Sequence, residues 1–325
     1  MQILDMIKRI EGTKELNIVR NNSNPYRILL KNDTLSAYYF SVPIYRESDK
    51  KLVKLCWQKE KGKDVFYGIN ATVSVQENEV TLKNYYGQAR ITCSDEIEIE
   101  PTLNGIAVRS ISGNIVFNII LDRDFSVREN EKYFALMKDE FEPFLIVNGL
   151  YAKANDKMVP LKITAVKRDK LKYELTVEGY SKGINQMLFE IDLYSGKFIF
   201  DTTVESKNPD ANNAFGGVAF LGETEEYGEQ WLYTRFDPIQ LIDLREYQIK
   251  EANLYLPKYN DGNSSLDCHK MSISWCSFGT TWNTKNAFSE FMHVVRRSKK
   301  YEIVEVTDVV SDILRQDEPA NAGIV

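Results

Sequence analysis

The stretch Ala252-Asn-Leu-Tyr-Leu-Pro-Lys-Tyr-Asn-Asp-Gly262 predicts a β-strand that runs into a tight turn. Alternate residues from Ala252 to Leu256 are apolar and fall on one face of the strand, because strand side chains alternate with a period of two. Pro257 cannot donate to a strand ladder and ends the strand, and Asn260-Asp-Gly262 is a typical turn sequence. This stretch therefore indicates part of a β-sandwich.

The same pattern extends outward on both sides of the turn. After it, alternate residues from Asp267 to Trp275 predict a second strand, which leads into Trp275-Cys-Ser-Phe-Gly-Thr-Thr-Trp282. Before it, short alternating runs separated by turn sequences fill the segments 15–121 and 143–204. Many short, evenly spaced strands are typical of a sandwich or barrel.

Helical patterns are confined to short stretches. Residues 2–11 place isoleucine and leucine at helical spacing before Gly12, and Val309, Val310, Ile313 and Leu314 form an apolar stripe after the N-cap candidates Thr307 and Asp308. Residues 128–141 are the most helix-tolerant part of the middle, and we interpret them as a connector.

We therefore expect a mainly all-β chain of tandem β-sandwich or jelly-roll domains, with a short N-terminal helix and one short helix near the C-terminus. Residues 1–125 form the expected N-terminal β-sandwich-like domain. Residues 126–196 continue that domain or form a second small β domain, and the sequence leaves both alternatives open. Residues 197–325 form the last expected β-sandwich.

Composition excludes several classes of function. The chain has 325 residues and a formal charge of −6, which argues against nucleic acid as a partner, because phosphate binding needs a concentrated basic footprint. The basic cluster 296–300 fits a solvated loop. No apolar run is long enough for a membrane span, so no membrane insertion is expected. The first residues lack the long apolar region of a signal peptide.

Catalytic and metal-binding signals are weak. Cys268 and His269 are neighbours on an expected strand, so they point to opposite faces and do not form a nucleophile–base pair. Four cysteines are too few for a disulfide scaffold, and we interpret them as thiols. In Asp95-Glu-Ile-Glu-Ile-Glu100, carboxylates at alternate positions stand too far apart to share a calcium ion without loop ligands, so we expect a solvated strand edge and no cofactor.

Six patches in the C-terminal part carry a family resemblance. They are Asp201-Thr-Thr-Val204 with Asn208-Pro209, Thr234-Arg-Phe-Asp237, Ile249-Lys-Glu-Ala-Asn-Leu-Tyr-Leu256, Trp275 with Thr281-Trp-Asn283, Val306-Thr-Asp-Val309 and Asn321-Ala-Gly323. In this order they resemble the DNRLRE module, a jelly-roll-like β-sandwich similar to the propeptide domain of transforming growth factor β. The resemblance covers residues 199–325, and none covers residues 1–195.

The DNRLRE module usually runs one or two strands past the patch at 321–323. The resemblance therefore implies that this chain is a fragment or that another element covers the strand edge there, since an open edge promotes aggregation. The motif around Arg235 that gives the family its name is kept only loosely.

Such modules resemble non-catalytic parts of large bacterial surface and multidomain proteins. The resemblance implies a binding or structural role, with a glycan or a neighbouring protein domain as partner and a cell-surface or extracellular location. Two alternatives stay open. One is a structural component of an appendage or phage particle, whose edge strands pair with neighbouring chains. The other is a glycosidase-like enzyme that uses paired carboxylates, for which Glu140/Glu142 and Glu223/Glu225/Glu226 are candidates in type.

Aromatic side chains are the candidate binding residues, because exposed aromatic rings stack well on sugars and other apolar surfaces. We select Tyr255, Tyr259, Trp231 and Phe278. Tyr255 faces away from Leu254 and Leu256, and Tyr259 lies beside the turn, so these two are expected to be exposed. Trp275 and Trp282 match positions expected in the core of the module.

Overall fold

The computed structural model describes residues 3–19, 24–31, 34–41, 43–48, 51–54, 56–68, 71–93, 98–101, 105–110, 115–154, 157–178, 184–193, 197–219, 221–258, 265–315 and 322–325. Most of them form strands. The helices are short: α1 (Ile3–Glu11), the 3-10 helix η1 (Pro238–Leu244) and α2 (Thr307–Arg315). The prediction of an all-β chain with one short helix near each end is confirmed. No helix among the residues described is long and apolar enough to cross a membrane.

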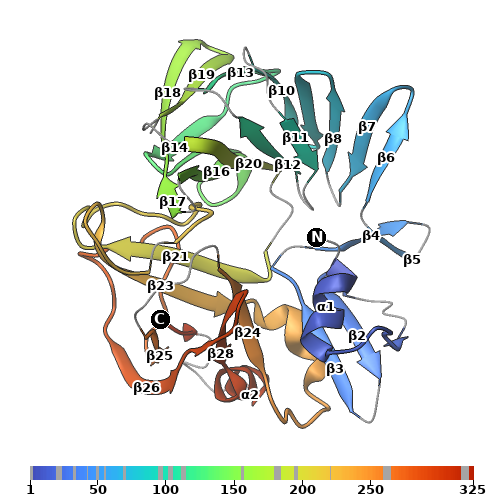
Figure 1. The fold of residues 1–325 in the computed structure, drawn as a ribbon, viewed down its shortest axis with the longest axis vertical. Coiled ribbons are helices and arrows are strands. Elements are labelled where there is room, and N and C mark those ends of the chain that lie inside the picture. Colours follow the sequence, from blue (N-terminus) through green and yellow to red (C-terminus); the bar gives the residue numbers. More distant parts are fainter. Residues whose placement is uncertain are drawn as a thin grey trace.

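Two large antiparallel sheets form a sandwich in the upper part of Figure 1. One sheet has the order β18 (Lys162–Asp169), β19 (Lys172–Glu178), β13 (Ile115–Leu121), β10 (Gly87–Cys93), β9 (Glu79–Asn84), β8 (Ala71–Gln76), β7 (Lys63–Tyr67), β6 (Trp57–Glu60). The other has the order β11 (Glu98–Pro101), β12 (Gly105–Ser110), β20 (Ile184–Leu193), β16 (Pro143–Ala154), β15 (Tyr133–Met137), β14 (Ser126–Asn130), and β17 (Lys157–Pro160) pairs with β16. A single buried cluster draws on both sheets, so strands on either side of residue 125 share one core.

Burial follows the sequence pattern in one strand and departs from it in another. In β13, alternate residues from Ile115 to Leu121 are buried, as a period of two requires. In β15, all five residues are buried. The interpretation of residues 128–141 as a helix-tolerant connector is therefore wrong, because a strand covered on both faces shows a continuous apolar run instead of alternation.

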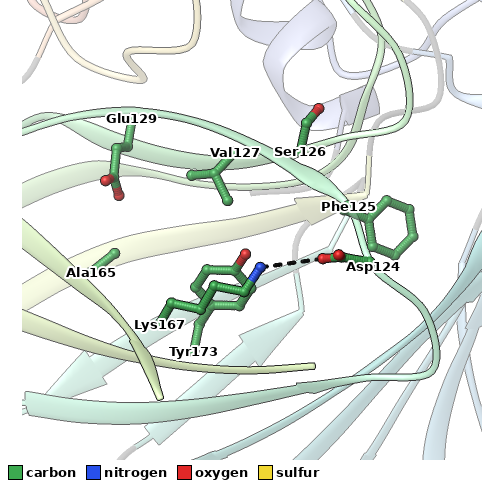
Figure 2. Close-up of a pocket in the computed structure, with 8 residues that line it drawn as sticks. All are labelled: Asp124, Phe125, Ser126, Val127, Glu129, Ala165, Lys167 and Tyr173. Atoms are coloured by element: carbon green, nitrogen blue, oxygen red, sulfur yellow. Dashed lines mark hydrogen bonds and ion pairs between the residues drawn. The ribbon is translucent and has the colours of Figure 1, made fainter. Parts of the chain in front are cut away.

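The sandwich is open along the side where β14 and β18 are the edge strands. At one end, the Ile163 amide of β18 donates to the carbonyl of Glu131, in the turn after β14, at 2.9 Å. Beyond that contact the two strands enclose a hollow of about 620 Å³ (Figure 2).

The lower part of Figure 1 holds the second body, built mainly from residues 197–325. We refer to these residues as the C-terminal module. Its sheets are β21 (Ile199–Glu205), β23 (Gly228–Phe236) and β22 (Gly222–Thr224); β25 (Asp267–Met271) and β26 (Phe288–Val294); and β24 (Asn253–Pro257), β28 (Tyr301–Glu305) and β27 (Arg296–Arg297). The strand expected to continue to Trp275 ends at Met271, although Trp275 is still buried.

Residues 323–325 join two of these sheets. Ile324 exchanges backbone hydrogen bonds of 2.9 and 2.8 Å with Thr234 of β23, and Val325 exchanges bonds of 2.7 and 2.9 Å with His269 of β25. We call residues 323–325 the bridging segment. It covers the edge of β23 at Thr234. The sequence did not show which element would cover a strand edge in this part of the module. Gly323 has φ +78°, and a Cβ there would overlap the Thr234 carbonyl oxygen, so glycine is required.

The N-terminal segment packs against the C-terminal module. Its elements are α1, β1 (Ile18–Val19), β2 (Arg27–Lys31), β3 (Leu35–Tyr39), β4 (Tyr45–Ser48) and β5 (Lys51–Lys54). Ile7 of α1 is buried against β2. Tyr39 stacks on Phe198 at 5.0 Å, and Arg27 forms an ion pair of 2.5 Å with Asp243. The sandwich is thus inserted between two parts of the chain that lie together (Figure 1).

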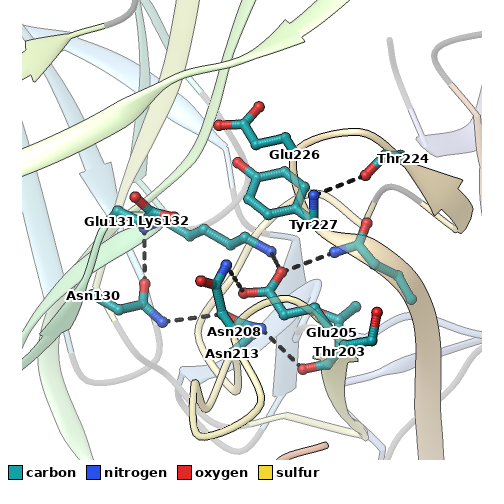
Figure 3. A network of polar contacts seen from close by, with 12 residues as sticks. Asn130, Glu131, Lys132, Thr203, Glu205, Asn208, Asn213, Thr224, Glu226 and Tyr227 are labelled. Atoms are coloured by element: carbon teal, nitrogen blue, oxygen red, sulfur yellow. Dashed lines mark hydrogen bonds and ion pairs between the residues drawn. The ribbon is translucent and has the colours of Figure 1, made fainter.

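A buried polar network links the sandwich to the C-terminal module (Figure 3). Glu205, 1% exposed, forms an ion pair with Lys132 from the turn between β14 and β15. It also accepts hydrogen bonds from Gln230 (3.1 Å) and Asn208 (3.2 Å). Lys132 lies 3.9 Å from the centre of the Tyr227 ring, and burial lowers its pKa against the opposing effect of Glu205. These contacts fix the two bodies together.

Candidate binding surface

Trp231 lies at the margin of a covered sheet face. Trp231, Tyr233 and Arg235 alternate on one face of β23. Tyr233 is fully buried and meets Trp275 edge to face at 5.5 Å, because the loop after β25 covers the face there. Trp231 is half-buried, with Trp282 and Lys285 of the same loop against its ring.

Aromatic rings continue from Trp231 across the surface. Its ring centre lies 5.2 Å from Trp282 and 5.3 Å from Phe288. His269 lies 4.0 Å from Phe288 and 5.8 Å from Phe291. We call these five residues the aromatic stripe. Phe291 is 57% exposed and Phe288 is 37% exposed, so the stripe presents open ring surface.

A bulge places both phenylalanines on this face. Phe291 pairs with His269 and Phe288 pairs with Met271, so four residues of β26 (288–291) lie opposite three of β25 (269–271). The extra residue restores Phe288 to the same side as Phe291, whereas strict alternation would put them on opposite faces. Sequence reasoning missed both for this reason.

Polar groups border the aromatic stripe. The Trp231 indole donates to Glu229 at 2.8 Å. The Lys285 ammonium lies 3.6 Å from the centre of the Trp282 ring and donates to the Trp282 carbonyl at 3.1 Å. Open ring faces beside a carboxylate and an ammonium suit a ligand that is apolar on its faces and polar at its edges.

The other selected residues lie elsewhere. Phe278 is half-buried at the joint, 5.3 Å from Phe215 and beneath the Arg128 guanidinium at 5.2 Å. Tyr255 is half-buried on β24, where it meets Tyr301 edge to face and burial raises its pKa. Tyr259 lies outside the described residues. The structure therefore brings neither Phe278 nor Tyr255 to the aromatic stripe.

The two tryptophans expected in the core differ. Trp275 is 6% exposed and donates its Nε1 hydrogen to the Ala322 carbonyl at 2.6 Å, as a core residue does. Trp282 is half-buried and belongs to the stripe, so its assignment to the core was only partly right.

The side chains of Cys268 and His269 point to different sides of the sheet. Burial raises the pKa of the Cys268 thiol to about 12 within an apolar cluster, whereas His269 contacts Phe288. The expectation that they form no nucleophile–base pair agrees with this geometry. All four cysteines are free thiols.

Most of the candidate carboxylates lie in turns of the described chain, and the described residues hold no cluster of metal ligands. No three of their histidine, cysteine, aspartate and glutamate side chains converge as metal ligands. Glu140 and Glu142 lie in the turn after β15, where Glu142 pairs with Lys138. Glu225 and Glu226 lie in the turn before β23, where Glu226 pairs with Lys162 at 3.6 Å. Of the acidic stretch 95–100, residues 95–97 lie outside the described residues.

Comparisons with family models, curated proteins and solved structures found no match.

Proposed function

We propose that this chain is a non-catalytic binding module of a larger bacterial surface or multidomain protein, and that it binds carbohydrate through the aromatic stripe. The single observation that supports this most strongly is the stripe itself, in which five aromatic rings form a continuous line that ends in the largely exposed Phe291. Sugar rings present apolar C–H faces and polar edges, which match aromatic rings bordered by Glu229 and Lys285.

The resemblance to the DNRLRE module supports the same proposal through the fold. Several residues that carry it have structural roles: Trp275 is in the core, Thr234 pairs with the bridging segment, and Gly323 fits only without a side chain. The aromatic stripe uses few of those residues. The ligand is therefore proposed from the stripe, and the module type from the resemblance.

Affinity electrophoresis of the full chain in gels that contain hydroxyethylcellulose, xylan, galactomannan or polygalacturonate tests the proposal. We expect retardation by at least one polysaccharide. Phe291→Ala should weaken binding by about fivefold or more, because a stacked aromatic contact contributes about 0.5–1.5 kcal/mol beyond the area that it buries. Phe291 is exposed, so its removal leaves the core intact.

Tyr85→Ala is the matched control, since Tyr85 is an 88% exposed aromatic residue on the sandwich, away from the stripe. Its binding should equal that of the wild type. The proposal fails if no polysaccharide retards the chain. It also fails if Phe291→Ala and Tyr85→Ala bind as tightly as the wild type.

A further inference from the structure

The hollow between β14 and β18 is bounded at both ends. At one end, the Ile163 amide donates to the Glu131 carbonyl at 2.9 Å, and Lys162 pairs with Glu131 at 2.7 Å. At the other end, Lys167 pairs with Asp124 at 3.3 Å. Figure 2 shows this pair at one side of the hollow and Glu129 at the other. The opening is therefore a window of defined length in the wall of the sandwich.

Apolar groups line much of the window. Val127 and Glu129 point inward, because their cross-strand partners Leu136 and Phe134 belong to the sandwich core and paired residues share a face. Opposite them lie Ala165 and the Tyr173 ring, which is covered by the Lys167 side chain with its ammonium 5.4 Å from the ring centre. The window thus offers an apolar lining to a side group that enters it.

Glu129 is the one lining carboxylate whose side chain has no hydrogen bond or ion pair among the described residues, whereas Asp124 is matched by Lys167. These three charges leave a net negative charge in the window. The neighbouring Arg128 is not its partner, because it faces the opposite side of β14 and lies over Phe278. Partial burial raises the pKa of Glu129, although its side chain remains exposed to solvent.

We propose that this window binds a primary ammonium group carried on a short apolar chain, with Glu129 as its counter-ion. The aliphatic part lies against Val127 and Ala165, and the ammonium reaches the Glu129 carboxylate, which gains the partner that it lacks. Neither contact involves the aromatic stripe, so the proposal stands apart from carbohydrate binding. An anion would meet the unpaired Glu129, and a neutral chain would leave it unpaired.

Titration of the full chain with n-butylammonium chloride, followed by the ¹³C-labelled methyl group of Ala165, tests the site. We expect a saturable shift at Ala165 and none at Ala71, an alanine methyl on β8. Glu129→Gln should weaken the interaction at least about threefold, since an ion pair at an exposed carboxylate contributes up to about 1 kcal/mol. Glu178→Gln, an exposed glutamate of β19, should leave it unchanged.

n-Butanol, which is neutral, and butyrate, which is an anion, test whether binding depends on the positive charge or only on contact of the alkyl chain with the apolar lining. Both should bind at least about threefold more weakly than n-butylammonium. If Nα-acetyl-lysine methylamide binds more tightly than n-butylammonium, the ammonium comes from a lysine in a peptide. If it binds more weakly, the ammonium comes from a free amine.

An inward-pointing charge can also serve only to protect a strand edge from pairing. That role predicts no shift at Ala165, or equal shifts with n-butylammonium and n-butanol, and either result overturns the proposal. Equal affinities of the wild type and Glu129→Gln also overturn it.

Discussion

Gly323→Ala removes the conformation that seats the bridging segment. Gly323 has φ +78°, where an L-residue with a side chain costs about 1–2 kcal/mol. Its Cβ would also overlap the Thr234 carbonyl oxygen and lie 2.9 Å from Arg235 Cα, and both are backbone atoms that cannot turn away. The segment must therefore shift out of the sheet.

The cost follows from the hydrogen bonds at risk. Residues 323–325 make five backbone bonds to Thr234, His269 and Met271, each contributing about 0.5–1.5 kcal/mol net. Partial loss of these bonds plus the φ strain gives a destabilisation of about 3–5 kcal/mol. That is a large part of the roughly 5–15 kcal/mol by which a domain is stable.

Urea unfolding followed by tryptophan fluorescence measures this loss, because Trp275 donates its indole hydrogen to Ala322 beside the segment. Gly222→Ala is the matched control in the same module, with φ +99° and no atom within 4 Å of its Cβ. It should cost only the strain, about 1–2 kcal/mol. If both variants lose the same stability, the bridging segment is not seated between β23 and β25 and the reasoning is refuted.

Three further predictions concern buried or partly buried groups. Lys132→Met should destabilise the chain by about 3–5 kcal/mol, because it leaves Glu205 charged and unpaired inside the joint, and Lys132→Met/Glu205→Gln should recover part of that loss in the same urea assay. In the native chain at pH 8, a thiol reagent should modify the exposed Cys56 and Cys276 and spare Cys268, whose burial raises its pKa to about 12; rapid modification of Cys268 would contradict its placement. Glu129 has a raised pKa, so the folded state binds the proton more tightly and loses stability as pH rises through the range between the unfolded and folded pKa values. Glu129→Gln should therefore raise the free energy of unfolding at pH 7 by no more than about 0.5 kcal/mol, since the group is exposed, and should leave it unchanged near pH 3.

Local patterns predicted much of the fold. Strand β24 ends at Pro257, as turn chemistry indicated. Helix α2 begins at Thr307, so Thr307 lies inside the helix and is not the N-cap expected, and its hydroxyl accepts the Ala252 amide hydrogen instead. Strand β15 was missed, because an apolar run covered on both faces carries no period. The position of β2 and β3 against the C-terminal module was also missed, since contacts between distant segments leave no local signature.

The candidate site shows the same division. Trp231 could be selected as an aromatic residue in an aromatic-rich module. Phe288 and Phe291 could not be assigned to one face, because the bulge in β26 is set by pairing with β25 and is not written in either strand alone. Tyr255 was expected to be exposed, and it is half-buried by Tyr301.

The position of the bridging segment has a consequence for synthesis on the ribosome. Thr234 and His269 can form their backbone hydrogen bonds to Ile324 and Val325 only after Val325 has left the exit tunnel. Tyr39 can stack on Phe198 only after Phe198 has left it. The sandwich, by contrast, has all its strands between Trp57 and Leu193. The middle of the chain can thus fold before the N-terminal segment and the C-terminal module come together, and the apolar ring of Tyr39 stays uncovered by Phe198 during that interval.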